Sequence, residues 1–368
     1  MRLPTLEDLP DPSGLRVLLR ADFNVPQRDD GTIADDLRIR AALPTIEWLS
    51  QRGAHVTACT HLGRPKGKPD PRYSVEPVRR RLKELAPQVE LLENLRFDPG
   101  EEGNDAAFVD RLVDGQDLYV NDAFGAAHRA HASIVGPPTR LPSAAGRLLA
   151  GEVDVLGGLL EEPKHPFVAV LGGAKVSDKL GVIDALLDKV DQLVVGGAMC
   201  FTFFVALGHQ IGDSLVEPDR VDQCKALLDA AGDKLLLPSD ISALGPNDDV
   251  RQVRRSIPPG YRGLDIGPGS AAEFSDAIND GRTVFWNGPM GVFEDERFAA
   301  GTRTVAYAVA ECRGFTIVGG GDVVSAVNSF GLAADIDHVS TGGGASLEFI
   351  EQGDLPGLAA LRMASNAN

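Results

Sequence analysis

The segment FVAVLGGAKVSDK, residues 167–179, decides the fold because it joins a short apolar run to a glycine turn and the start of a helical pattern. An apolar run of this length suits a strand that is covered on both faces, and glycine permits the sharp turn that follows it. Similar runs alternate with amphipathic segments along the chain. They are RVLLR (16–20), HVTACT (55–60), VELLEN (89–94), DLYVN (117–121), QLVVG (192–196), KLLLP (234–238), TVFW (283–286), FTIV (315–318) and DHVS (337–340). This alternation predicts βα units and parallel sheets.

The length of 368 residues favours two domains, because a single core rarely keeps growing at this size. The first 150 residues are nearly balanced in charge, so the remainder carries most of the net charge of -17. The segment 142–166, where this character changes, is interpreted as a helix that ends in a turn containing proline. We therefore predict an α/β protein with two doubly wound domains, at residues 1–155 and 156–353.

Composition also excludes several classes of function. A strongly acidic chain without a basic face disfavours nucleic-acid and anionic-membrane partners. No apolar run is long enough to span a bilayer, and the first residues lack a signal-peptide pattern, so we expect a cytoplasmic protein. The four cysteines are scattered singly, which argues against a zinc site and a disulfide framework.

Basic side chains follow all four strands predicted in the first half. Because the carboxyl ends of parallel strands meet at one edge of a sheet, these side chains should converge there. They are Arg20, His61, Arg64, Arg96, His128, Arg129 and His131, with Arg38 at the start of the next helix. Any one of them alone would be an ordinary surface cation. Four consecutive strand ends predict a site for a small, strongly anionic molecule, with Asp22 and Asn24 available to hold a hydroxyl group.

Glycine follows the strands of the second half instead. The segments are LGGAKVSDK (171–179), VGGAM (195–199), WNGPMGVFE (286–294), VGGGDVV (318–324) and STGGGAS (340–346). Glycine lets the backbone approach a ligand, and a following helix offers free N–H groups, so the five turns together predict a nucleotide cradle. Neither GxxxxGK[ST] nor a clean GxGxxG is present, so neither a P-loop nor the usual dinucleotide fold is predicted.

Charged residues near these glycines suit phosphate and metal. Lys175 and Lys179 are four positions apart at a helix start, where both can neutralise phosphate oxygens. Asp178 and Asp322 are candidate carboxylates for Mg²⁺, which binds proteins through one or two carboxylates plus phosphates. Asp322 also suits a helix N-cap, and both roles can hold together.

Eight motifs, in this order, closely resemble the phosphoglycerate kinase family. They are RADFNVP, HLGRPKGK, LLENLRF, NDAFGAAHRAH, GGAKVSDK, WNGPMGVFE, GGGD and HVSTGGGASLE. The resemblance runs from about Leu15 to Leu361. It implies two Rossmann-like domains that face each other across a hinged cleft, and a monomeric enzyme of glycolysis. The reaction implied is transfer of a phosphoryl group from 1,3-bisphosphoglycerate to ADP, giving 3-phosphoglycerate and MgATP.

The resemblance also assigns residues. It places Asp22, Asn24, Arg38, His61, Gly63, Arg64, Arg96 and Arg129 on the phosphoglycerate. It places Gly173, Ala174, Lys179, Gly197, Gly263, Asn287, Pro289, Glu294, Gly320, Gly321, Asp322 and Val323 on the nucleotide, with Glu294 on the ribose and Asp322 on the metal. Arg38, Lys175 and the amides of Gly343 and Gly344 are the implied catalytic groups. The attacking oxygen is already ionised, so we expect catalysis by positioning and charge neutralisation, without a general base.

The resemblance further implies domain closure, with the helix near 143–160 in the hinge, and a tail at 354–368 that returns to the first domain. Two departures stand out. The segment KELAPQVELLEN joins two motifs between which the family has a further strand and helix, so the first domain is expected to lack one βα unit. Val323 and Ala126 stand where hydroxyl side chains are common, and Val323 is expected to weaken nucleotide affinity. Two alternatives remain: a non-catalytic nucleotide-binding regulatory protein and, less favoured, a dehydrogenase.

Overall fold

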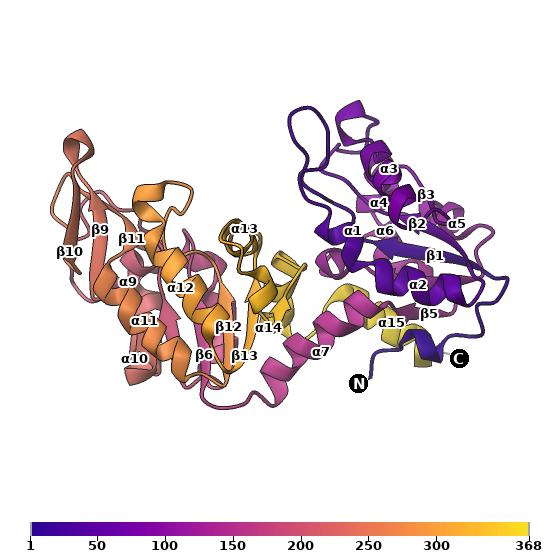
Figure 1. Cartoon of the computed structure of the whole chain (residues 1–368). Coiled ribbons are helices and arrows are strands. Elements are labelled where there is room, and N and C mark those ends of the chain that lie inside the picture. The colour runs from indigo at the N-terminus through magenta and orange to yellow at the C-terminus, as the bar shows by residue number, and fades with distance from the viewer. Residues whose placement is uncertain (1, 367–368) are drawn as a thin grey trace. The chain divides into compact units, whose positions relative to one another are not determined.

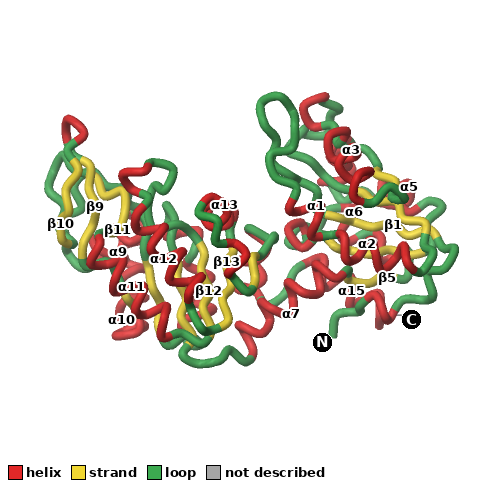
Figure 2. Tube along the Cα trace, viewed as in Figure 1, coloured by secondary structure: helices red, strands yellow, loops and turns green. Residues whose placement is uncertain are grey.

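The computed structural model describes residues 2–366 and divides into two compact units. Unit 1 contains the residues up to Leu156 together with the segment from Gln352, and unit 2 is Gly157–Glu351. The chain leaves unit 1 within the helix α7, Arg147–Glu161. Each unit contains a parallel sheet flanked by helices, as the α/β class predicted from the sequence requires (Figure 2).

Unit 1 is built on a five-stranded parallel sheet of order β3-β2-β1-β4-β5 (Figure 1). The strands are β1 (Arg16–Ala21), β2 (His55–Cys59), β3 (Glu90–Leu91), β4 (Leu118–Asp122) and β5 (Ser143–Ala145). The central strand β1 pairs with β2 on one side and β4 on the other, so Leu19 lies opposite both Ala58 and Val120. The residues that follow β1, β2 and β4 therefore leave the sheet at the same edge.

Helices cover both faces of this sheet. One face forms a core with α1 (Leu37–Ala41), α2 (Leu43–Gln51) and α3 (Glu76–Leu85), in which Val17 and Leu19 of β1 are buried. Toward the other face, Tyr119 donates its hydroxyl hydrogen to the Ser133 carbonyl in α6 (Ala132–Val135). The remaining α-helices of this unit are α4 (Pro99–Glu102), α5 (Ala106–Val113) and α15 (Pro356–Asn366). Residues of both strand faces are thus buried, as expected for a parallel sheet.

Two helical segments differ from the sequence-based expectation. The pattern LRIRAALPTIEWLSQRG, which starts at Leu37, predicts one helix. In the structure this helix is divided at Ala42, and Pro44 lies in the first turn of α2, where its missing N–H costs nothing. The segment 142–166 was expected to be a helix, but Ser143–Ala145 form β5 and pair with β4 before α7 begins. Strand pairing overrides the helix propensity of the two alanines there.

Unit 2 contains a six-stranded parallel sheet of order β14-β13-β12-β6-β7-β8. The strands are β6 (Phe167–Leu171), β7 (Gln192–Val195), β8 (Leu235–Leu236), β12 (Thr283–Asn287), β13 (Phe315–Gly319) and β14 (His338–Val339). The helices are α8 (Leu180–Leu187), α9 (Cys200–Ala206), α10 (Val221–Ala231), α11 (Pro268–Asp280), α12 (Ala300–Glu311), α13 (Gly321–Ser329) and α14 (Gly344–Gln352). All six strands match runs predicted from the sequence.

A second sheet in unit 2 was not predicted. It is antiparallel, with the order β10-β9-β11 and the bounds Asp240–Leu244 for β9, Val250–Arg254 for β10 and Arg262–Ile266 for β11. These strands carry charged side chains and no continuous apolar run, so the pattern that revealed the parallel sheet is absent from them. Within residues 2–366, no helix is both long and apolar enough to cross a membrane.

Candidate functional site

The first candidate site lies in unit 1 and begins with Arg20, whose side chain is fully buried near the end of β1. Its Nε donates to the Ser133 hydroxyl at 2.8 Å, and a terminal nitrogen lies 3.1 Å from Nδ1 of His61. The other terminal nitrogen of Arg20 donates to the Ala21 carbonyl. Each of the guanidinium nitrogens therefore has a partner, as a buried cation requires.

Asp22 and Asn24 connect the loop after β1 to its neighbours. Arg38 donates to Asp22 Oδ2 at 2.6 Å, and the Asn24 side-chain oxygen accepts from the Gly63 amide at 2.9 Å. Although burial opposes it, Arg38 together with His61 and Arg20 holds the pKa of Asp22 below its ordinary value. The Arg96 side chain donates to the Gly63 carbonyl at 2.8 Å, so three loops meet around this glycine.

The histidines of this cluster are neutral at neutral pH. Burial lowers the pKa of His61 well below its ordinary value, and Arg20, Arg96 and Arg129 lower it further. Burial, with Arg96 and Arg129, lowers the pKa of His131 to about 4. Burial also lowers the pKa of Arg96 to about 10, which leaves this guanidinium charged at neutral pH. The positive charge of the cluster therefore comes from its arginines.

Buried nitrogen atoms without hydrogen-bond partners mark the cluster as a place for a ligand. Arg96 Nε and His131 Nδ1 are buried and have no hydrogen-bond partner, although both lie within 4.0 Å of a carboxylate oxygen. Arg129 donates from Nε to His128 Nε2 at 3.1 Å. Buried polar atoms without partners are uncommon in folded proteins, and ligand oxygens would satisfy them.

Most of the residues predicted for this site are linked in the structure. Hydrogen bonds or close charges join Asp22, Asn24, Arg38, His61, Gly63, Arg96 and Arg129. The Arg64 side chain is exposed on the loop after β2, next to Gly63. The lysines that follow, Lys66 and Lys68, are also exposed.

The second candidate site lies in unit 2, where three glycine loops are bonded to one another. The Gly173 amide donates to the Pro289 carbonyl at 2.9 Å, and the Gly197 amide donates to the Met290 carbonyl at 3.2 Å. Gly197 has a φ of +65°, and a Cβ at this position would lie 2.5 Å from the Gly173 nitrogen. Only glycine permits this approach of the turns after β6, β7 and β12.

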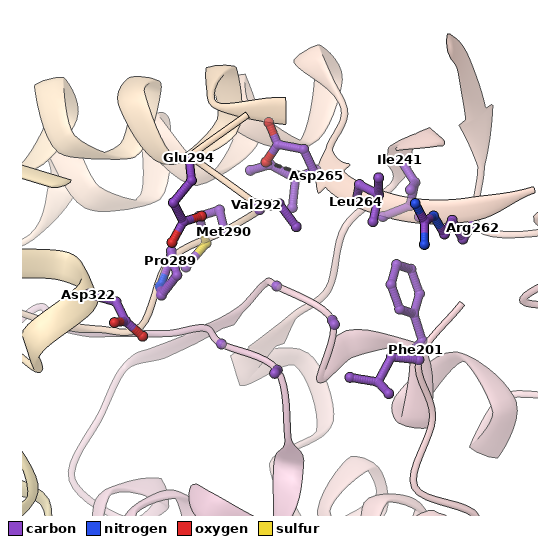
Figure 3. A pocket seen from close by; sticks show the side chains of 18 of the residues that line it. Phe201, Ile241, Arg262, Leu264, Asp265, Pro289, Met290, Val292, Glu294 and Asp322 are labelled. Carbon is purple, nitrogen blue, oxygen red and sulfur yellow. Dashed lines mark hydrogen bonds between the residues drawn. The ribbon is translucent and has the colours of Figure 1, made fainter. Parts of the chain in front are cut away.

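These loops form one wall of a pocket of about 470 Å³. Its lining includes Gly173, Ala174, Gly197, Gly263, Pro289, Glu294 and Asp322 among the predicted nucleotide residues. Figure 3 shows Asp322 and Glu294 toward one end, and Phe201, Arg262 and Leu264 toward the other. The pocket thus has carboxylates near the glycine loops and a mainly apolar opposite end, an arrangement that suits a nucleoside phosphate.

The buried amine of Lys179 interacts with the charge of Asp322, which lines this pocket. Its Nζ donates to Asn287 Oδ1, and burial lowers the pKa of Lys179 against the opposing charges of Asp178 and Asp322. The other amide atom of Asn287, Nδ2, is buried without a partner. A Cβ built on Gly320, whose φ is +95°, would lie 2.9 Å from this nitrogen. These groups are therefore packed tightly at the end of β12.

Several predicted residues lie outside the pocket lining. Gly321 opens α13 and Gly344 opens α14, so both helices present free amides at their first turns. Lys175 is exposed just after the turn of β6, and Gly343 has a φ of +52°. Val323 is fully buried in the core of unit 2, so only its backbone could face a ligand.

Asp322 also fits the metal that a phosphate-binding site of this kind uses. Its carboxylate is exposed, lines the pocket and stands at a helix start. Mg²⁺ is typically held by one or two carboxylates plus phosphate oxygens and water, so a dedicated cluster of ligands is not required. No group of three or more His, Cys, Asp or Glu side chains suited to a metal occurs among residues 2–366.

Sequence reasoning missed the apolar end of the pocket. Phe201 comes from α9, Ile241 from β9, and Leu264 and Asp265 from β11, so this end depends on the antiparallel sheet that was not predicted. Asp265 is buried and accepts from the Gly301 amide at 2.7 Å, and burial raises its pKa to about 7. In the sequence, the only sign of this apolar end is the motif GLDIGPG (263–269), which follows a polar segment.

The phosphoglycerate kinase family model matches residues 6–90 and 85–353. The chain belongs to the phosphoglycerate kinase family. It is 53% identical to the phosphoglycerate kinase of Rubrobacter xylanophilus, with 95% of each chain covered. It is 52% identical to that of Salinispora arenicola, with 98% of this chain and all of the relative covered. Among solved structures, phosphoglycerate kinase from Coxiella burnetii matches with a TM-score of 0.89 at 37% identity, covering 98% of this chain and 99% of that one.

The comparisons also bear on the predicted loss of a βα unit. The alignment with the Salinispora arenicola protein spans 399 positions, more than the 368 residues of this chain, so that relative contains residues absent here. The two stretches matched by the family model meet at residues 85–90, between α3 and β3. This is the place at which the sequence predicted the omission. The strand that follows it, β3, is an edge strand of two residues.

Proposed function

We propose that the chain catalyses reversible transfer of a phosphoryl group from 1,3-bisphosphoglycerate to ADP, which gives 3-phosphoglycerate and ATP. The observation that carries this proposal is the paired presence of the basic cluster of unit 1 and the glycine-lined pocket of unit 2 in a member of this family. The cluster suits a small polyanion, and the pocket suits a nucleotide.

Unit 1 holds the phosphoglycerate in this proposal. Arg38, Arg96 and Arg129 contribute positive charge for its phosphate and carboxylate oxygens, because a guanidinium presents paired donors to such groups. Asp22 and Asn24 accept from or orient the substrate hydroxyl and hold the surrounding loops through Arg38 and Gly63. The exposed Arg64 is assigned to the same substrate by its place in the motif.

Unit 2 holds the nucleotide. The apolar end of the pocket takes the base, Glu294 takes the ribose, and the amides that open α13 take the phosphates. Lys179 and Lys175 add positive charge near the transferred group, together with Arg38 and the amides of Gly343 and Gly344. Asp322 holds Mg²⁺, which neutralises charge on the nucleotide phosphates when it is bound.

Catalysis then requires positioning rather than proton transfer. A carboxylate and a diphosphate oxygen are ionised at neutral pH, so neither needs a base to become a nucleophile. The described side chains bind, orient and neutralise charge, which is the main contribution of proteins to phosphoryl transfer. Because the two ligands are assigned to different units, we further propose that the units close during the reaction, with α7 in the hinge. Scattering profiles that stay unchanged when both substrates are added would contradict closure.

The decisive experiment is formation of ATP from 1,3-bisphosphoglycerate and ADP by the purified protein, with Arg38→Ala as the comparison. We expect rapid turnover by the wild type and little by the variant. A wild type no faster than the variant would favour the alternative of a non-catalytic nucleotide-binding regulatory relative. Size-exclusion chromatography with light scattering tests the predicted monomer, and cell fractionation tests the predicted cytoplasmic location.

A further inference from the structure

Glu101 lies behind the basic cluster of unit 1 and is fully buried in α4. One of its carboxylate oxygens accepts from the Ser133 amide at 2.9 Å, and the other accepts from the Ser133 hydroxyl at 2.7 Å. The same hydroxyl oxygen accepts from Arg20 Nε at 2.8 Å. Arg20 in turn contacts His61, so a buried chain of four residues leads from Glu101 to the candidate substrate site.

The direction of each hydrogen bond in this chain is fixed by chemistry. An ionised carboxylate only accepts, so the Ser133 hydroxyl must donate to Glu101 and offer its lone pairs to Arg20. A guanidinium only donates, so His61 Nδ1, 3.1 Å from Arg20, must be the acceptor. A neutral imidazole with an unprotonated Nδ1 carries its proton on Nε2.

The surroundings of His61 favour this neutral donor. Burial is the main cause of its lowered pKa, and the guanidinium groups of Arg20, Arg96 and Arg129 act in the same direction, against the carboxylate of Asp22. No hydrogen bond among residues 2–366 is assigned to His61 Nε2, so this N–H remains available to a ligand.

We propose that Glu101 and Ser133 are positioning residues that, through Arg20, hold His61 in the neutral tautomer with its proton on Nε2, ready to donate to the bound anion. The anionic Glu101 also balances the buried charge of Arg20 through the shared hydroxyl. This role rests on the proposed function, because the anion in question is the phosphoglycerate of the unit 1 site. Neither Glu101 nor Ser133 is assigned to touch the substrate.

The tautomer is measured directly by long-range ¹H–¹⁵N correlation spectra of protein labelled on histidine, with the His61 signals assigned by their loss in His61→Gln. At neutral pH we expect the wild type to show an unprotonated Nδ1 and a protonated Nε2. In Ser133→Ala, Arg20 and Glu101 lose their shared hydroxyl partner and are expected to rearrange. The ¹⁵N signal of His61 Nδ1 should then move toward the position of a tautomer mixture. Glu101→Gln should move it in the same direction, because the acceptor loses its charge.

Kinetics in the direction of ATP consumption provide the second measurement. We expect Ser133→Ala to raise KM for 3-phosphoglycerate about tenfold, because a bound anion loses one well-placed donor. KM for ATP should change less than about twofold, since the nucleotide is assigned to unit 2. The matched control is Ser143→Ala, which removes a buried hydroxyl of the same unit that donates to the Leu141 carbonyl.

The outcomes separate the possibilities. A proton on Nδ1 of His61 in the wild type would overturn the proposed tautomer. If Ser133→Ala and Glu101→Gln both give the same spectra and KM values as the wild type, the chain of hydrogen bonds has only a structural role. If Ser133→Ala does not fold, the result for Glu101→Gln alone decides between the two roles. An inactive wild type would contradict the proposed function alone, because the spectra read the tautomer without turnover.

Discussion

The candidate sites of the two units present different groups to an anion. Unit 1 uses charged side chains such as Arg20 and Arg96, which are buried and held by partners from distant parts of the chain. Unit 2 uses backbone, since its pocket is walled by glycine turns that bond to one another. Side chains can supply full charge to a compact triose, whereas amides and helix starts can follow an extended phosphate chain. Substitutions in unit 1 should therefore weaken ligand binding by removing charge, and substitutions in unit 2 should weaken it by steric clashes between the glycine turns.

The largest effect is expected from Arg38→Ala. Arg38 forms an ion pair of 2.6 Å with Asp22, and the proposed function places its charge beside the transferred phosphoryl group. Turnover should fall by about 10³-fold or more, as for other phosphoryl-transfer arginines, while ADP affinity is retained. Steady-state assays and ADP titration measure the two quantities. Arg40→Ala is the control, because Arg40 lies on the same helix and pairs with Asp36 on the surface; an equal loss in both variants would contradict a specific role.

A smaller but still large effect is expected from Gly197→Ala. The added Cβ would lie 2.5 Å from the Gly173 nitrogen at a φ of +65°, so the bonded loops must separate. We expect ADP affinity to fall about 100-fold and stability by ~2–3 kcal/mol.

Calorimetric titration and thermal unfolding measure these losses. Gly208→Ala is the matched control, since Gly208 has a φ of +80° but nothing within 4 Å of a built Cβ. It should cost about 1 kcal/mol and leave ADP affinity unchanged. Similar affinities in the two variants would show that the backbone approach is not required for binding.

A pH-dependent effect is expected at Asp122, whose carboxylate accepts from the Leu148 and Leu149 amides at the start of α7. Burial raises its pKa to about 6 from 3.8, so the folded state binds more protons between these values. The contribution of this carboxyl to stability is therefore present below about pH 4 and is lost as pH rises through 6, by up to ~3 kcal/mol.

Denaturant unfolding at pH 4.5 to 7.5 should show this decrease in the free energy of unfolding with rising pH, added to the contributions of other titrating groups. Asp122→Asn keeps one oxygen for the two amides and removes the titration, so the variant should gain stability relative to the wild type as pH rises. A difference between variant and wild type that does not change with pH would exclude Asp122 as the titrating group.

The smallest effect is expected from Val323→Thr. If unit 2 binds phosphates through amides, a hydroxyl at this buried position should change ADP affinity by less than about twofold and lower stability by ~1 kcal/mol. Titration and thermal unfolding measure both. A marked gain in affinity would instead support the sequence-based expectation that the missing hydroxyl weakens nucleotide binding.

Most strands of the parallel sheets, with the motifs at their edges, were predictable because these strands are short apolar runs followed by basic residues or glycine. FVAVL before the first glycine turn and RVLLR before ADFNVP are examples. Periodicity is a local property, so it reveals such elements without knowledge of the rest of the fold.

The features that depend on distant partners were not predictable. Arg20 meets Ser133 across 113 positions, and nothing near Ser133 indicates that it bonds a buried guanidinium. The strand β5 consists of one serine and two alanines, which adopt a strand only because β4 lies beside them. The same holds for the apolar end of the pocket, where β9 and β11 pair around polar residues.

The helix α15 completes unit 1 from the far end of the sequence, with Leu358 and Leu361 fully buried and the Gly357 amide bonded to the Ala127 carbonyl. During synthesis, all of Gly157–Glu351 leaves the ribosome before this helix does. Unit 2 can therefore finish folding while unit 1 still exposes the surface that α15 will cover, and that surface needs protection from aggregation until α15 has been synthesised.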